Sequence, residues 1–117
     1  MELLVCVINQ EDKLEPVLSG LAELGVAGAT IVATRGMAEH LPADTPVLAG
    51  LQDLLTRSRP EHTMVLSVIE SDATVERAIE MINNVLGNLE RAGTGILFTI
   101  PVTRALGLAG SPSSGLD

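Results

Sequence analysis

The 117-residue chain has almost no aromatic side chains: Trp and Tyr are absent, and Phe98 is its one Phe. It therefore lacks the aromatic platforms on which single-stranded nucleic acids stack. Basic residues are also few, since seven Lys and Arg stand against fifteen Asp and Glu, for a net charge of −8. A phosphate backbone repels a chain of that charge. Both shortages argue against a nucleic-acid binder.

Cysteine and long apolar runs are scarce as well. Cys6 is the single cysteine, so no internal disulfide can form, which is typical of proteins of the reducing cytoplasm. No stretch reaches the roughly 18 apolar residues of a membrane-spanning helix. Glu2, with no Lys or Arg nearby, makes the N-terminus a poor signal peptide. We therefore expect a cytoplasmic protein without a membrane span.

Aliphatic residues, by contrast, are abundant: hydrophobic residues make up 46% of the chain, and its mean hydropathy is +0.38. Four apolar runs have the length of strands: 3–8, 29–34, 64–69 and 95–102. A helical pattern with one apolar face follows the first run and another follows the third. Each half thus reads strand, helix, strand. This order predicts an α+β, ferredoxin-like βαββαβ sandwich with a four-stranded antiparallel sheet.

Capping signals mark both predicted helices. Asp12 and Glu15 have the spacing of a capping box, with Asp12 as the N-cap of the first helix. Ser71 or Asp72 can cap the second helix. Gly25 and Gly87 are typical helix stops. The residues expected on the apolar face of the first helix are Leu14, Val17, Leu18, Leu21 and Ala22, and those of the second are Val75, Ala78, Ile79, Ile82 and Leu86.

The predicted strands are apolar on both faces. In the first strand Leu3, Val5 and Val7 point to one side, and Leu4, Cys6 and Ile8 point to the other. Two helices can cover only one face of the sheet, and so large an apolar surface is not left in water. Either another subunit covers it, in a closed symmetric oligomer, or the segment 35–60 folds back over it. We expect the oligomer.

The segment 35–60 is too long for a simple turn. Thr45-Pro46 is typical of a helix start, and an apolar stripe follows at Val47, Leu48, Leu51, Leu54 and Leu55. We expect a short extra helix there, between the second and third strands. At the other end of the chain, residues 109–117 are rich in Gly, Ser and Pro, so we expect a flexible tail after a domain of residues 1–108.

No catalytic set stands out, so we expect a protein that is not an enzyme. Cys6 lies within an apolar run and is interpreted as a small buried hydrophobe. His40 and His62 lack further ligands at a workable spacing, so no metal site is predicted. The stretch Gly93-Thr94-Gly95 offers backbone N–H groups to a phosphate or carboxylate, or is an ordinary helix-to-strand turn. Arg35, beside Gly36, pairs with an anion or is simply solvated.

Together, the order of elements, the Thr34-Arg35-Gly36-Met37 sequence and the run Gly93–Val102 resemble the P-II nitrogen regulatory family, and more closely its divergent PII-like branch. The resemblance covers residues 1–108. It implies a signalling homotrimer that binds ATP, ADP or another small anionic ligand between subunits and engages a partner protein. The ligand-binding residues carried over by position are Arg35, Gly36, Gly93, Thr94, Gly95 and Arg104. Ile96 stands where the family motif has a lysine, which removes one phosphate-pairing ammonium.

Two alternatives of other classes stay open. One is a trimeric adaptor without a metabolite ligand, which docks a partner through the stripe of Leu48, Leu51 and Leu55. The other is a metal-responsive trimer, similar to the copper-tolerance proteins of the same fold. It requires His40, His62 or Cys6 to converge across a subunit interface. Because the chain has no Tyr, tyrosine modification is excluded in every case.

Overall fold

The structure is a computed structural model that describes residues 1–36, 62–91 and 94–108. Its elements, in chain order, are β1 (Glu2–Ile8), the 3-10 turn η1 (Glu11–Lys13), α1 (Leu14–Glu23), β2 (Thr30–Thr34), β3 (His62–Ile69), α4 (Asp72–Leu86) and β4 (Gly95–Pro101). This order confirms the predicted βαββαβ pattern. The short helix expected after Thr45-Pro46 and the expected tail 109–117 lie outside the described residues.

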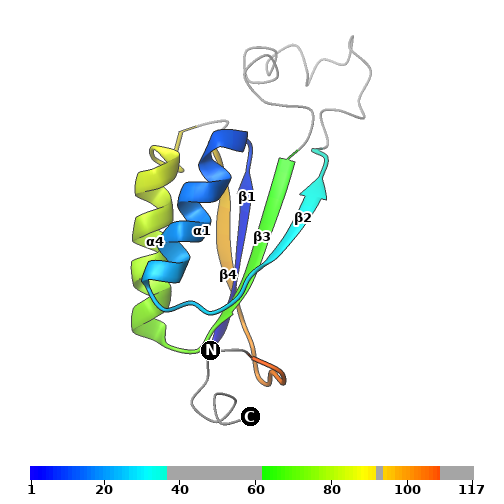
Figure 1. Ribbon diagram of the computed structural model, residues 1–117, viewed down its shortest axis with the longest axis vertical. Coiled ribbons are helices and arrows are strands. Elements are labelled where there is room, and N and C mark those ends of the chain that lie inside the picture. Colours follow the sequence, from blue (N-terminus) through cyan, green and yellow to red (C-terminus); the bar gives the residue numbers. More distant parts are fainter. Residues whose placement is uncertain (37–61, 92–93, 109–117) are drawn as a thin grey trace.

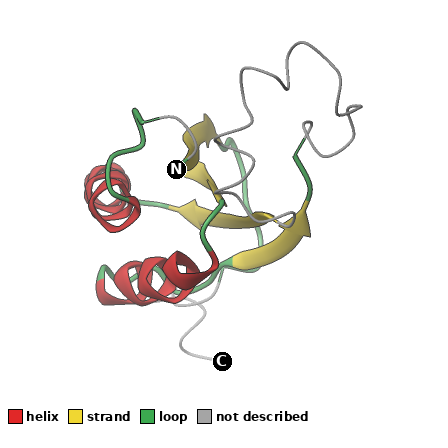
Figure 2. Cartoon of the chain, turned by 90° about the horizontal axis from the view of Figure 1, so that it is seen from above, coloured by secondary structure: helices red, strands yellow, loops and turns green. Residues whose placement is uncertain are grey.

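The four strands form one sheet in the order β2-β3-β1-β4, and every neighbouring pair is antiparallel. Both helices lie on the same face of this sheet (Figure 1). Figure 2 shows the two layers from above. The arrangement confirms the expected α+β, ferredoxin-like fold. Within the described ranges, no helix is long and apolar enough to cross a membrane.

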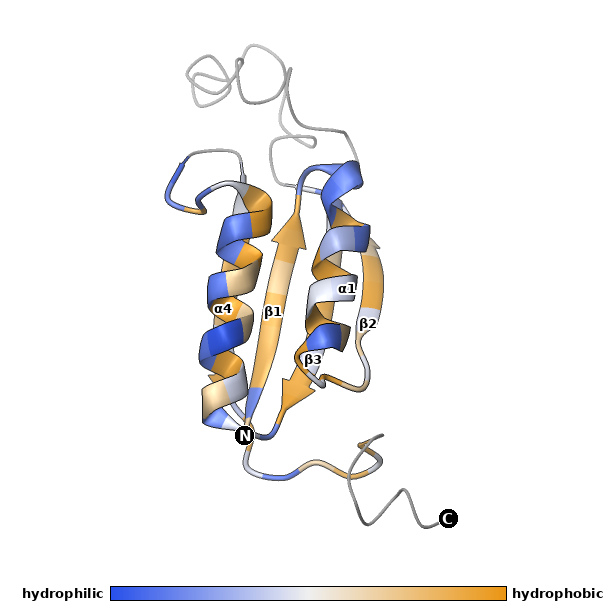
Figure 3. Ribbon diagram, turned by 60° about the vertical axis from the view of Figure 1, so that its left-hand side comes forward, coloured by the Kyte–Doolittle hydropathy of each residue, from blue (hydrophilic) through white to orange (hydrophobic). Residues whose placement is uncertain are grey.

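The core lies between the helices and the sheet. Its buried side chains come from all these layers: Leu4, Cys6, Ile8, Val17, Leu21, Val65, Ile69, Val75, Ala78, Ile82 and Leu86. Figure 3 shows the apolar strands behind helices whose outer surfaces are more hydrophilic. The one buried polar residue of the described chain, Ser67, donates a hydrogen bond from its hydroxyl to the carbonyl oxygen of Gly28 at 2.6 Å. The aliphatic core expected from the composition is therefore present.

The start of α1 differs from the expected capping box. Asp12 lies inside the turn η1, and Lys13 occupies the N-cap of α1 without a capping side-chain hydrogen bond. An N-cap residue needs extended backbone, which Asp12 does not adopt because the chain is already turning there. Ala22, expected on the apolar face, is exposed. The prediction was wrong on both points.

The ends of α4 follow the sequence signals. Ser71 has extended backbone and its hydroxyl oxygen accepts a hydrogen bond from the Thr74 amide at 3.3 Å. Gly87 ends the helix in the left-handed conformation, with φ of 83°. Gly25, just after α1, has φ of 86°. At a positive φ, the Cβ of any other residue type is crowded by the backbone. Glycine has no Cβ, so it adopts this conformation at both helix ends without that steric cost.

The second face of the sheet, here called the open face, is covered by neither helix. Its apolar residues form three rows across β3, β1 and β4: Val68–Leu3–Ile100, Leu66–Val5–Phe98 and Met64–Val7–Ile96. On β4 the exposed fractions are 60% for Ile96, 46% for Phe98 and 45% for Ile100. This confirms that the strands are apolar on both sides. What covers the open face stays a prediction.

Candidate functional site

The expected ligand-binding residues split between the two edges of the sheet. Arg35 and Gly36 follow the last residue of β2, whereas Thr94 and Gly95 lead into β4. Both groups lie at the same end of the sheet, since Ile8 pairs with Gly95 and also with Thr63, the neighbour of His62. However, β2 and β4 are the outermost strands, three strand spacings apart, or roughly 14 Å. One chain therefore does not bring them together.

Arg104 lies at the opposite end of the sheet. The amide of Val102 donates to the carbonyl oxygen of Met1 at 3.1 Å, which fixes the exit of β4 beside the N-terminus. Arg104 follows two residues later and is exposed. The length of a seven-residue strand, about 20 Å, separates it from Gly95. Gly93, the remaining expected site residue, lies outside the described residues.

Hydrogen bonds from its own side chains stabilise the turn between α4 and β4. The Thr94 hydroxyl donates to two carbonyl oxygens, that of Arg91 at 2.8 Å and that of Asn88 at 3.2 Å. The Asn88 side chain accepts from the Glu90 amide at 3.0 Å, and the Asn83 side chain accepts from the Leu89 amide at 2.8 Å. These contacts support the ordinary turn that the spacing allowed, and they give Thr94 a structural role.

Gly95 is required by the backbone itself. Its φ is 138°, a conformation that L side chains rarely adopt, and an added Cβ would run into the carbonyl oxygen of Val7. A glycine is needed here whether or not a ligand binds. A substitution at Gly95 would therefore disturb the fold, and the position cannot serve as a clean probe of ligand binding.

Cys6 is fully buried in the core. Burial raises the pKa of its thiol to about 11, so the thiolate that would act as nucleophile or metal ligand is scarce at neutral pH. This confirms the interpretation of Cys6 as a small hydrophobe. His62 opens β3, where its carbonyl oxygen accepts from the Thr34 hydroxyl at 3.2 Å. In the described part of the chain, no three His, Cys, Asp or Glu are grouped to hold a metal ion. His40 lies outside that part.

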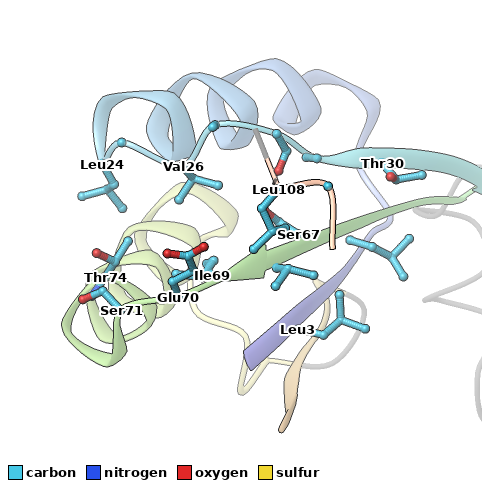
Figure 4. Close-up of a pocket in the computed structure, with 17 residues that line it drawn as sticks. Leu3, Leu24, Val26, Thr30, Ser67, Ile69, Glu70, Ser71, Thr74 and Leu108 are labelled. Carbon is cyan, nitrogen blue, oxygen red and sulfur yellow. Dashed lines mark hydrogen bonds between the residues drawn. The ribbon is translucent and has the colours of Figure 1, made fainter. Parts of the chain in front are cut away.

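A cavity of about 550 Å³ lies elsewhere, between the loop that leaves α1 and the end of β3 (Figure 4). The start of α4 and the residues Gly107 and Leu108 complete its lining. Sequence reasoning missed this site. The signal that could have found it is the run Ala27-Gly28-Ala29, three consecutive residues with no side chain beyond a methyl group.

Residues 1–108 match the family model of nitrogen regulatory protein P-II. No curated protein matches the chain.

Proposed function

Because the chain belongs to the nitrogen regulatory protein P-II family, we propose that it is a non-catalytic signal-transduction protein. In this proposal a homotrimer binds a small anionic metabolite or nucleotide at the clefts between subunits and signals to a partner protein. Residues 1–108 form the ligand-binding domain of this proposal, and 109–117 form its C-terminal tail. The family match over residues 1–108 carries the proposal.

The open face supports the homotrimer. Its three rows leave Ile96, Phe98 and Ile100 about half exposed on one edge of the sheet. Burial of the exposed half of each such side chain stabilises an assembly by about 1 kcal/mol of hydrophobic free energy. A closed ring of subunits provides this cover in every copy, because the same apolar surface then faces the centre of the assembly.

The split of the predicted site supports clefts between subunits. In a ring, the β4 edge of one subunit approaches the β2 edge of the next. Arg35 of one chain would then lie beside the turn at Thr94 and Gly95 of its neighbour. The guanidinium would neutralise an anion such as ATP, ADP or 2-oxoglutarate, and backbone N–H groups would donate hydrogen bonds to it. Arg104, at the other end of the sheet, belongs to this cleft only if the ligand spans its length.

The chain between Gly36 and His62 supports signalling from this end. It leaves the sheet beside Arg35 and re-enters it at His62, opposite Thr34. A ligand held at Arg35 would favour one arrangement of that segment over others. The surface offered to a partner protein would then depend on the ligand.

Calorimetry with ATP, ADP, 2-oxoglutarate and bicarbonate tests the proposal, on protein shown to be trimeric by native mass spectrometry. We expect at least one ligand to bind with three sites per trimer. Arg35→Gln removes a charge-assisted hydrogen bond and should weaken binding by about tenfold. Arg77→Gln, an equal charge change at an exposed position of α4, is the control. Silence across the panel, or equal losses in both variants, would contradict the proposal.

One observation favours a second candidate, the adaptor without a metabolite ligand. The turn at Thr94 and Gly95 is fully explained by its own hydrogen bonds and backbone conformation, so no ligand is needed to account for it. Pull-down of the partner separates the two functions. If the protein is an adaptor, the triple variant Leu48→Ala, Leu51→Ala and Leu55→Ala should no longer bind the partner. The variant Arg35→Gln should still bind it.

A further inference from the structure

His62, the first residue of β3, lies on the open face of the sheet. Side chains alternate along a strand. Val65 is buried on the helix side, whereas Met64 lies on the open face, so His62, two residues before Met64, lies on the open face as well. Its pair with Thr34 forms the row that follows the last of the three apolar rows. The open face therefore carries an imidazole at one end of its apolar surface.

The main chain fixes the position of this histidine. The carbonyl oxygen of His62 accepts a hydrogen bond from the Thr34 hydroxyl at 3.2 Å, and the pair of these two residues is the last one between β2 and β3 at this end. His62 is half-buried, so part of its side chain is accessible in a single chain. A ligand side chain held on a strand is positioned more precisely than one held on a loop.

The strand order places β3 close to the axis of a threefold ring. In the proposed homotrimer each sheet forms one side of the ring, with its open face inward and its β2 and β4 edges beside those of its neighbours. The strands β3 and β1 flank the middle of the sheet, which is the part of each side that lies closest to the axis. Four strands a side put that middle roughly 5 Å from the axis, half the usual distance between packed sheets. The Cα of His62 then lies about 6 Å from the axis.

That distance matches the reach of a histidine ligand. From Cα through the ring to Nε2, and across a metal–nitrogen bond of about 2 Å, the reach is about 6 Å. Threefold symmetry places three copies of His62 at the same level along the axis. Three neutral imidazoles are a set that zinc accepts, with water as the fourth ligand. The described part of one chain holds no group of three such ligands, so the set exists only in the assembly.

The charge of the chain favours a cation at this place. Each chain has a net charge of −8, so an assembly of three attracts cations. Arg35 directly follows Thr34, and the alternation of β2 puts it on the side of the sheet away from His62. The neighbours of His62 on the open face of β2 and β3, Thr34 and Met64, carry no charge. A metal ion on the axis is therefore not repelled by these neighbours.

We propose that three copies of His62, one from each subunit, bind one zinc ion on the threefold axis of the homotrimer. The site rests on the trimer of the proposed function and adds a metal ion to it. It is separate from the anion cleft, because the cleft lies where the edges of two subunits meet and the metal lies at the centre of all three. An ion that binds the trimer and not the single chain stabilises the trimer.

Native mass spectrometry of the untagged chain with added zinc tests this site. We expect one zinc ion per trimer, and none with magnesium at the same concentration, because magnesium prefers oxygen ligands. His62→Gln should remain trimeric and bind zinc at least about 100-fold more weakly, since it removes all three ligands. His40→Gln, the same change at the other histidine of the chain, is the matched control and should bind zinc as the unaltered chain does.

Two further measurements do not depend on the folding of His62→Gln. In the unaltered ¹⁵N-labelled chain, zinc should shift the imidazole signals of His62 and leave those of His40 in place. Phe98→Asp puts an unpaired carboxylate on the open face and should give single chains. These chains retain His62 and should bind no zinc at the concentration that fills the trimer.

Four results would overturn the inference: a trimer without zinc, one zinc ion per chain in place of one per trimer, zinc retained by single chains of Phe98→Asp, or equal zinc binding by His62→Gln and the unaltered chain. Anion binding is followed separately by calorimetry. A trimer that binds an anion and no zinc would leave the proposed function standing, whereas an unaltered chain that is monomeric would overturn both proposals.

Discussion

Two residues show how differently single positions are constrained in this fold. Gly95 is determined by the main chain, since its φ of 138° and its approach to the carbonyl oxygen of Val7 leave no room for a Cβ. Cys6 is determined by its surroundings, because the core excludes water from its thiol and raises the pKa to about 11. Neither constraint depends on a ligand. Both can therefore be tested by stability measurements alone.

Gly95→Ala should lower the free energy of unfolding by at least about 2 kcal/mol, from backbone strain and the collision with Val7. Urea denaturation followed by circular dichroism measures the change. Gly25→Ala is the matched control: its φ is 86°, but a Cβ there meets nothing within 4 Å. The control should lose about 1 kcal/mol. Similar losses in the two variants would show that contact with Val7 contributes nothing.

Cys6 should make stability depend on pH in the alkaline range. The unfolded thiol ionises near pH 9.0 and the folded one near 11, so its contribution is constant below pH 9 and is lost as pH rises toward 11. The free energy of unfolding should fall by about 2 kcal/mol over that window. Denaturation series at pH 8 to 11 compare the chain with Cys6→Ala, which should show a flatter profile. An identical slope in both would contradict a buried thiol.

At the scale of elements, local sequence patterns were sufficient to predict those helices and strands whose position is determined by local interactions. The four apolar runs and the two amphipathic patterns predicted every described strand and α-helix within about two residues, because burial of a repeating apolar face fixes such segments. The start of α1 was missed, since the spacing of Asp12 and Glu15 holds no information on a preceding 3-10 turn. The cavity was missed for a tertiary reason: it arises from where β2 begins relative to β3.

The caps of α4 and α1 give a matched pair of substitutions. Ser71→Ala removes the acceptor of the Thr74 amide and should cost about 1 kcal/mol of stability. Asp12→Ala, at the residue that only resembles a cap, should cost less than about 0.5 kcal/mol. Thermal unfolding by differential scanning calorimetry compares the two. A larger loss of stability for Asp12→Ala than for Ser71→Ala would indicate that Asp12 caps α1 and would contradict the observed turn.

At the scale of the whole molecule, the candidate site could be predicted only in part. Arg35 and the turn at Thr94 do lie at one end of the sheet, as their positions at strand ends implied. Their separation follows from the strand order β2-β3-β1-β4, which a list of strands along the chain does not contain. The same order leaves the open face uncovered by the helices, and this was foreseen because the strands alternate between two apolar sides.

Phe98→Asp should break the proposed trimer. Phe98 lies in the middle row of the open face, and a carboxylate buried there would lack a partner. Native mass spectrometry should find the single chain of 12.2 kDa in place of three times that mass. Leu106→Asp makes the same kind of change at a residue that is 91% exposed and outside the sheet, and should leave the trimer intact. A trimeric mass for Phe98→Asp would refute the open face as the interface.

The close approach of Gly95 to Val7 also bears on misfolding. In most half-buried sheets, a slip of one residue is prevented because it turns apolar side chains into water. Here β1 is apolar on both sides, so a slipped β4 would lose little by burial. Gly95 sits opposite Ile8, and its neighbours Thr94 and Ile96 both carry a Cβ. Either neighbour could take the place of Gly95 opposite Ile8 only with a different backbone conformation, since a Cβ at φ of 138° would meet the carbonyl oxygen of Val7. The glycine therefore favours the observed register of β4, which alternation of polarity does not secure.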